Sequence, residues 1–259
     1  MNYFQYIADD VRQHLSNMGV HKLEDIIGQT QYLEMIKDLD KQYKTIDLSD
    51  LLYKDESLQE PFFCTEKKNQ PWDKGSLARK ILRNVKKSID ENTSISLDTK
   101  ISNRDRSFGA LISGYIADKY GEEGVSKPIT INLEGSAGQS FGCWNANGLV
   151  LNINGDANDY VGKGMNGGRI VVKNNYSYAS SKNNPSLVGN TCLYGATGGE
   201  LYVSGRAGER FAVRNSGAKA VIEGAGDHCC EYMTGGNVTL LGSVGANFGA
   251  GMTGGFAYV

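Results

Sequence analysis

The residue types that could perform chemistry are densest at residues 227–231, where the sequence reads Asp-His-Cys-Cys-Glu. A cysteine and a histidine in contact could act as nucleophile and general base. His228 and Cys229 are adjacent, however, and adjacent side chains on an extended segment point to opposite faces. Cysteines in a strand-rich repeat are usually small core hydrophobes. We therefore expect no catalytic site here, and the chain has only three histidines with which to build one elsewhere.

Two glycine motifs match the spacing of a dinucleotide-binding fingerprint, at residues 162–167 and 249–254. That fingerprint lies between a strand and a helix, so that the N-terminus of the helix faces the pyrophosphate. In this chain a further glycine and a strand-like alternation follow each motif. We therefore expect no nucleotide site at either position.

Asp156 and Asp159 are candidates for calcium binding, and together with Glu209 they are candidates for glycoside hydrolysis. Calcium requires six to eight oxygen ligands, and the equivalent segments at 205–209 and 242–246 do not supply them. A glycosidase pairs two carboxylates across a cleft, whereas Asp and Asn at turns commonly bond the local backbone. The expected sets of catalytic, cofactor-binding and metal-binding residues are therefore all empty.

Four charged residues within nine positions form a further cluster, which consists of Arg206, Glu209, Arg210 and Arg214. They could form a salt-bridged ladder on one face of the fold, or a docking surface for another domain. The sequence favours neither interpretation over the other.

The element that must position these residues is a glycine-rich repeat. Its copies open at Gly135, Gly155, Gly189, Gly205, Gly224 and Gly242. Most copies end in a turn followed by residues that alternate between apolar and any type, which indicates a strand with one buried face. One copy cannot bury that face alone, so each copy must stack on the next. The predicted fold is mainly β, a right-handed parallel β-helix (a solenoid) preceded by a small α-helical and mixed region.

Glycine is expected at the corners of these copies, where the chain needs positive φ or a close backbone approach. Of the 33 glycines, 26 lie between residues 135 and 255. If the corner at Gly235 holds a positive φ, Gly235→Val should destabilise the fold by roughly 1–3 kcal/mol. The predicted structural corners are Gly148, Gly167, Gly168, Gly198, Gly199, Gly217, Gly235, Gly236, Gly254 and Gly255.

The chain before the repeat has ordinary glycine content and helical spacing of its apolar residues. The spacing predicts helices over residues 4–18, 77–89 and 108–120, short helices at 23–27 and 32–39, and strands at 95–101 and 129–133. Residues 174–186 are expected to be an inserted surface loop. The predicted domains are a helical segment (1–44), a mixed α/β linker region (45–127) and the repeat (128–259).

The bulk composition restricts partners and compartment. The net charge of −2 gives no case for nucleic acid, and no apolar run reaches the roughly 18 residues that span a bilayer. The N-terminus lacks a signal-peptide pattern, and an odd number of cysteines (five) argues for reduced thiols. We predict a cytoplasmic protein with neither a nucleic-acid nor a membrane partner.

The strings at residues 135–142, 155–165, 189–199, 205–217, 231–236 and 247–259 together resemble the C-terminal GXGXG domain of the glutamate synthase large subunit. Residues 101–115 and 64–66 are similar to the segment that precedes this domain. Residues 3–30 resemble the end of the family's FMN-binding barrel, to which the predicted segment 1–44 would belong. The resemblance covers nearly the whole chain.

The resemblance implies a part of an enzyme that converts glutamine, 2-oxoglutarate and reductant into two glutamates. It uses FMN, an iron–sulfur cluster and electrons from NAD(P)H or ferredoxin. The family's repeat domain is a scaffold that braces the amidotransferase and FMN-synthase domains. No catalytic or cofactor residue transfers to this chain, so whether the chain itself counts as an enzyme stays open.

Two alternatives to a scaffold domain remain. The chain could be a stand-alone scaffold subunit of a split glutamate synthase or of another redox complex, or a carbohydrate-active protein in its own right. Val259 directly follows the last copy, where the family continues, and Met1 lies within the expected last barrel helix. These ends suggest a truncated product or a fragment, and an uncapped last copy could pair with a second molecule to form a homo-oligomer.

Overall fold

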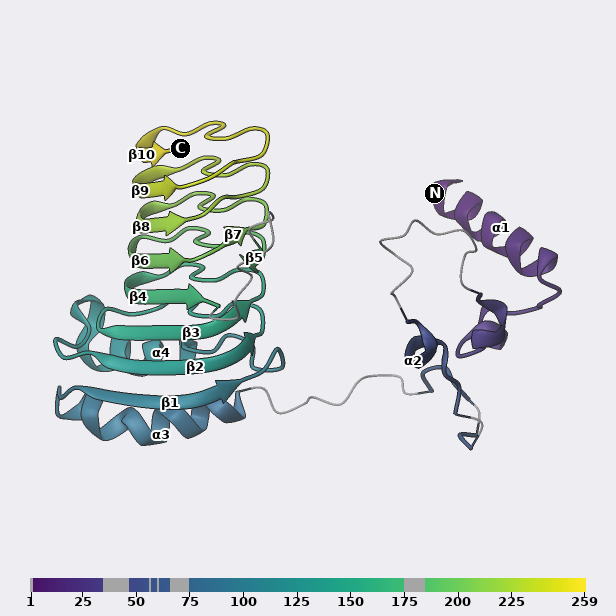
Figure 1. Cartoon of the computed structure of the whole chain (residues 1–259), viewed down its shortest axis with the longest axis horizontal. Helices are drawn as coiled ribbons and strands as arrows, with labels where there is room; N and C mark the ends of the chain where they lie inside the picture. The colour runs from purple at the N-terminus through teal and green to yellow at the C-terminus, as the bar shows by residue number, and fades with distance from the viewer. Residues whose placement is uncertain (1, 35–46, 56, 60, 66–74, 175–184) are drawn as a thin grey trace. The chain divides into compact units, whose positions relative to one another are not determined.

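The computed structural model describes residues 2–34, 47–55, 57–59, 61–65, 75–174 and 185–259 (Figure 1). The chain divides into two compact units, Met1–Pro71 and Trp72–Val259. Most of the short helix expected at 32–39, and the inserted loop expected at 174–186 except for its ends, lie outside the described residues. The functional domain boundaries at residues 44/45 and 127/128 remain a prediction.

The first unit contains helix α1 (Asn2–Asn17), the 3₁₀ turns η1 (Leu23–Ile26) and η2 (Thr30–Tyr32), and the short helix α2 (Ser49–Leu52). α1 ends at Gly19, whose φ of 71° lets the Val20 amide donate back to the Leu15 carbonyl at 2.9 Å. Leu15 is the buried residue of this helix. The apolar stripe that the sequence places on α1 is therefore mostly exposed within the described unit.

The second unit begins with helix α3 (Ser76–Asp90), strand β1 (Ile95–Ile101), helix α4 (Ala110–Tyr120) and the 3₁₀ turn η4 (Gly121–Glu123). α3 buries Ile81, Val85 and Ile89, the stripe expected from their four-residue spacing. Asp90 at the end of α3 joins the two helices, because it accepts hydrogen bonds from Lys119 Nζ at 2.8 Å and from Tyr115 Oη at 2.6 Å.

One parallel sheet runs through this unit in the order β1-β2-β3-β4-β6-β8-β9-β10, with β5 and β7 paired off this path. Each strand pairs in parallel with the strand of the next repeat, as the stack in Figure 1 shows. The strands after β1 are β2 (Ile129–Ala137), β3 (Leu149–Ala157), β4 (Asn166–Lys173), β5 (Ser186–Val188), β6 (Gly198–Val203), β7 (Arg206–Ala207), β8 (Ser216–Ile222), β9 (Thr234–Leu240) and β10 (Gly254–Tyr258).

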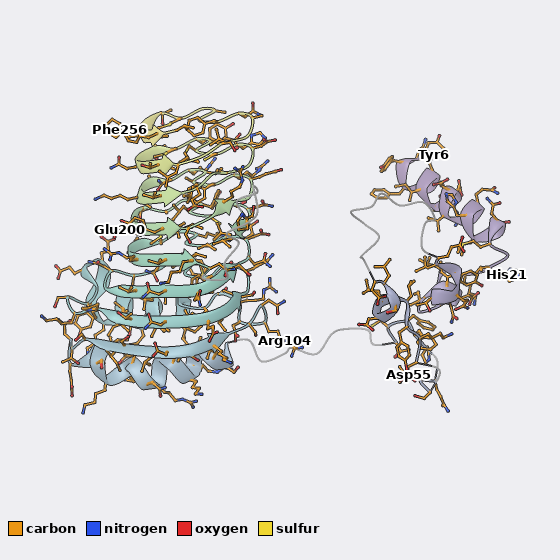
Figure 2. All side chains as sticks on the ribbon, viewed as in Figure 1. Tyr6, His21, Asp55, Arg104, Glu200 and Phe256 are labelled. Atoms are coloured by element: carbon orange, nitrogen blue, oxygen red, sulfur yellow. The ribbon has the colours of Figure 1, made fainter. Side chains whose placement is uncertain are left out.

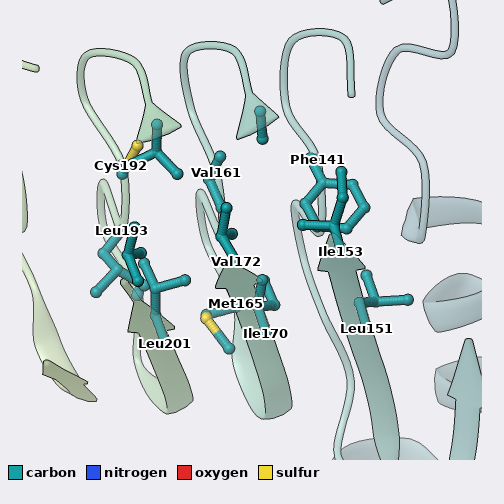
Figure 3. Packing of buried hydrophobic residues seen from close by; sticks show 14 of the residues in the cluster. Phe141, Leu151, Ile153, Val161, Met165, Ile170, Val172, Cys192, Leu193 and Leu201 are labelled. Carbon is teal, nitrogen blue, oxygen red and sulfur yellow. The ribbon is translucent and has the colours of Figure 1, made fainter. Parts of the chain in front are cut away.

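The register of the sheet places apolar residues of successive strands in line inside the stack. Leu151 pairs with Ile170, and Ile170 with Leu201, and Figure 3 shows the three side chains in the interior. All three are fully buried. Complete burial of one such side chain is worth roughly 1.5–3 kcal/mol, so the in-line core explains why the repeats stack in register.

Between strands, the chain returns through segments that are neither strand nor helix. We call these the return segments: residues 140–144, 160–164, 191–195, 210–214, 228–232 and 247–251. The first, third and fifth residues of each have positive φ. Their amides donate to both neighbouring repeats, as from Tyr160 to Asn190 O at 2.9 Å and from Gly162 to Phe141 O at 2.9 Å. The return segments therefore pair along the stack without forming a second long sheet.

The prediction of a mainly β, right-handed parallel β-helix is wrong. The chain folds as a ten-stranded parallel sheet with helices, an α/β fold. Two features that the repeat pattern does not reveal cause the difference. The return segments are left-handed turns instead of additional strands, and helices α3 and α4 supply part of the core through Val85, Ile89 and Ile112.

Candidate functional site

The predicted corner glycines lie where each return segment leads into the next strand of the sheet. Five of them have positive φ: Gly148 (86°), Gly168 (67°), Gly199 (88°), Gly236 (84°) and Gly255 (86°). The others are restricted by space: a Cβ on Gly198 would lie 2.5 Å from the Asn166 carbonyl oxygen, and one on Gly254 2.5 Å from that of Thr234. These contacts support the corner role that we propose for the set.

The condition of a positive φ at Gly235 is not met, because the left-handed residue of that turn is Gly236. A Cβ on Gly235 would instead clash with the carbonyl oxygen of Ser216 in the preceding repeat. The requirement for glycine therefore comes from close stacking of two backbones, and the sequence does not distinguish the two reasons.

The return segments present an exposed surface, which we call the turn face. It carries Trp144 (60% exposed), Tyr232 (53%), Tyr160 (37%) and the exposed Arg210 and Arg214. The sequence analysis identified the two arginines but not the aromatic residues. The repeats differ in length, so equivalent positions become clear only when the return segments are compared residue by residue. The shared fifth position of Trp144 and Tyr232 could have revealed them.

Glycine in the neighbouring repeat makes room for both large aromatic residues of the turn face. A Cβ on Gly164 would lie 2.9 Å from Cδ1 of Trp144, and one on Gly251 would lie 2.5 Å from Cδ1 of Tyr232. Each ring thus rests beside a bare backbone, which fixes its position while more than half of its surface stays exposed.

The charged cluster at residues 206–214 is not a salt-bridged ladder in the part of the chain that the structure describes. Arg206 donates from Nη1 to Ser243 Oγ at 2.8 Å and from Nη2 to the Ala225 carbonyl at 3.1 Å, so its side chain ties neighbouring repeats together. Glu209 forms no ion pair with the three arginines there. The docking interpretation of Arg210 and Arg214 remains a prediction.

The two cysteines of residues 227–231 are fully buried. Their Sγ atoms lie 3.7 Å apart, and the hydrogen bond to Cys230, together with burial, raises the pKa of the Cys229 thiol far above its usual range. His228 Nδ1 lies 3.5 Å from Glu231 Oε1. Burial in the core keeps both side chains away from solvent, which disfavours a role as nucleophile.

Both apparent dinucleotide motifs lead into strands. Residues 162–167 run into β4 and residues 249–254 into β10. No helix N-terminus follows either described motif, so the arrangement that binds a pyrophosphate is not formed at these positions.

The candidate carboxylates are only partly brought together. Asp159 and Glu209 line one surface pocket of about 520 Å³, together with Tyr160, Lys163 and Arg210, whereas Asp156 lies in β3. Within the described ranges, no group of three or more His, Cys, Asp or Glu side chains could hold a metal ion. Of the described helices, none has the length and apolar character of a membrane span.

These features define a glycine-rich repeat domain whose exposed arginine and aromatic side chains lie on the turn face. The chain belongs to the GXGXG motif family, which matches residues 76–259. Over its full length it is 47% identical to "Ferredoxin-dependent glutamate synthase 2" of Synechocystis sp. and 42% identical to "Glutamate synthase [NADPH] large chain" of Bacillus subtilis. It is also 42% identical, again over its full length, to "Glutamate synthase [NADH]" of Schizosaccharomyces pombe.

The chain spans 17% of the first two relatives and 12% of the third. It therefore corresponds to one part of these larger proteins. The resemblance to glutamate synthase that the glycine strings predict is confirmed.

Proposed function

We propose that the chain is the non-catalytic structural domain of a glutamate synthase, and that it braces the amidotransferase and FMN-synthase domains. The observation that carries this proposal is the match of the full chain to a small part of glutamate synthases. The overall reaction, from glutamine, 2-oxoglutarate and reductant to two glutamates, belongs to the whole protein. FMN and the iron–sulfur cluster are then bound outside this chain, and the location is cytoplasmic.

The construction of the stack supports a bracing role. Backbone hydrogen bonds join every repeat to its neighbours through both strands and return segments, and one apolar core is continuous from α3 to β9. Such a body transmits force with little deformation, since close-packed interiors are barely compressible. The turn face adds Trp, Tyr and Arg, the residue types that dominate binding energy at protein interfaces.

The test uses the native polypeptide that contains this chain, after its intact mass has been measured. A double variant, Trp144→Ala with Tyr232→Ala, should lower glutamine-dependent glutamate formation about tenfold or more, the effect of losing one interface hot spot. Glutamine hydrolysis and ammonia-dependent glutamate formation, measured separately, should stay within about twofold. Lys219→Ala, on the outer face of the sheet, is the control and should change none of the three rates.

Two results would contradict this assignment. If all three rates fall together while the fold is intact, the chain contributes to the chemistry itself. If none changes, the turn face does not brace the catalytic domains. A native polypeptide of only 28.1 kDa would instead favour the stand-alone scaffold subunit, and its bound partners would then identify the complex.

A further inference from the structure

The pocket on the turn face lies across three successive repeats. Amide-to-carbonyl bonds from Tyr160 to Asn190 (2.9 Å) and from Thr191 to Glu209 (2.8 Å) align the three return segments. Tyr160, Thr191 and Arg210 therefore occupy equivalent positions in one column. Tyr160 and Arg210 belong to repeats two steps apart, about 10 Å at the usual strand spacing. The small Thr191 between them leaves the hollow of about 520 Å³.

The hollow is lined by two carboxylates and two cations. In their repeats, Asp159 and Glu209 each come one residue before the column. Asn190 holds the same position in the repeat between them. Arg210 belongs to the column itself, whereas Lys163 and Tyr194 each come three residues after it in their own repeats. The formal charges of these four side chains cancel, so the hollow offers both signs of charge without a net charge.

The backbone around the hollow is fixed, while its charged side chains have unused binding capacity. Asp159 Oδ1 accepts the Asn190 amide at 2.8 Å, and Asn190 Oδ1 accepts the Glu209 amide at 2.8 Å. Among the described residues, the side chains of Tyr194, Glu209 and Arg210 form no hydrogen bond or ion pair. Lys163 places its Nζ 5.5 Å from the centre of the Tyr160 ring.

We infer that this pocket binds a small zwitterion of the α-amino acid type. The ammonium group would face Asp159 and Glu209, and the carboxylate would face Lys163 and Arg210. A simple anion would pair with only the two cations of the lining. A neutral sugar would leave all four charges of the lining without an opposite charge. The pocket shares Tyr160 and Arg210 with the turn face, so its binding is measured on the 259-residue chain as well as on the native polypeptide.

The test is calorimetric titration of the 259-residue chain, or of the native polypeptide, with L-alanine and L-glutamine. Propionate and ethylamine serve as the separate charged halves of a zwitterion, and mannose as a neutral sugar. We expect saturable binding of the amino acids, weaker binding of either half, and none of mannose. Arg210→Gln and Glu209→Gln should each weaken binding about 10- to 100-fold, the loss of one charge-assisted hydrogen bond.

Lys219→Gln removes a cation outside the pocket and is the matched control, with no expected change in affinity. Melting temperatures of all variants show whether each one is folded. The inference is overturned if no amino acid gives a saturable signal up to about 20 mM, some twentyfold above a millimolar dissociation constant. It is equally overturned if propionate binds as tightly as L-alanine, or if mannose binds in place of the amino acids.

Discussion

Arg214 has a left-handed backbone conformation, with φ of 55°, and an exposed side chain. For a residue with a Cβ this conformation costs about 1–2 kcal/mol. Glycine avoids this cost, but it loses more conformational entropy on folding, which offsets part of the gain. Arg214→Gly should therefore raise the free energy of unfolding by up to about 1 kcal/mol, as measured by urea denaturation. Lys219→Gly, the same kind of change in strand β8, should lower it by about 0.5–1 kcal/mol. Equal destabilisation by both variants would contradict this account.

Gly235 tests the other reason for glycine in this fold, close stacking of backbones. A Cβ at this position meets the Ser216 carbonyl oxygen of the preceding repeat, so Gly235→Ala should destabilise by roughly 1–3 kcal/mol. Gly114 in α4 has open space around its Cβ position, and Gly114→Ala should stabilise by about 0.5–1 kcal/mol through helix propensity. Thermal melting of the two variants should give shifts of opposite sign. An unchanged melting temperature for Gly235→Ala would remove this residue from the proposed corners.

At this scale the sequence indicates where turns fall, but not which residues with a side chain adopt the left-handed conformation. Gly-Gly and Asn-Gly pairs are turn signals with a known cause, and five of the ten predicted corners do have positive φ. Twelve of the eighteen left-handed residues in the return segments are not glycine, including Leu193, Ala212 and Cys230. Nothing local favours that conformation for such residues. The hydrogen bonds to the neighbouring repeats impose it, and these exist only once the repeats are stacked.

The junction of α3 and α4 depends on one carboxylate. Hydrogen bonds from Lys119, Lys86 and Tyr115 hold the pKa of Asp90 well below its ordinary value of 3.8. Because the folded-state pKa is lowered, the stabilisation is present above pH 4 and is lost as the pH falls below that value. Asp90→Asn should therefore be less stable than the wild type at pH 7, and the difference should shrink steadily as the pH is lowered from 4. Denaturant midpoints at several pH values measure this difference.

A control variant separates the Asp90 network from general acid effects. Glu91→Gln changes the next residue, whose Oε1 lies 3.9 Å from Lys87 Nζ in an exposed i,i+4 ion pair. Such a pair should contribute little to the free energy of unfolding at any pH. If Asp90→Asn and Glu91→Gln show the same pH dependence, Asp90 does not join the helices as described.

Elements with a clear period are predicted correctly from the sequence. The alternation over 95–101 matches β1, and the apolar stripe over 77–89 matches α3 within one residue at each end. Strands β3, β4, β6, β8, β9 and β10 begin at or close to the predicted turns. The return segments have no period of their own, since a backbone whose φ alternates in sign produces no hydrophobic pattern. The fold class was therefore predicted wrongly although most of the strands were predicted correctly.

At the scale of the whole molecule, two outer surfaces are candidates for docking another domain. The turn face has Trp144 and Tyr232, and the outer face of the sheet has Phe256 and Tyr258, which are 62% and 58% exposed with rings stacked 6.3 Å apart. Figure 2 shows Phe256 on the same edge of the stack as Glu200. On the sheet face, Glu200 is paired with Arg169 at 2.8 Å. On the turn face, Arg210 and Arg214 have no such ion pair among the described residues.

Unpaired arginines beside half-exposed aromatic rings favour the turn face, because pairing them with a partner breaks no ion pair within the domain. Oxidative footprinting of the native polypeptide should therefore show Trp144 and Tyr232 protected relative to this chain expressed by itself, once circular dichroism and melting have shown that the isolated chain is folded. Phe256 and Tyr258 should be oxidised at similar rates in both. Protection confined to Phe256 and Tyr258 would assign docking to the sheet face, and the turn face would then be left free in the assembled protein, open to the small molecules that its pocket is proposed to bind.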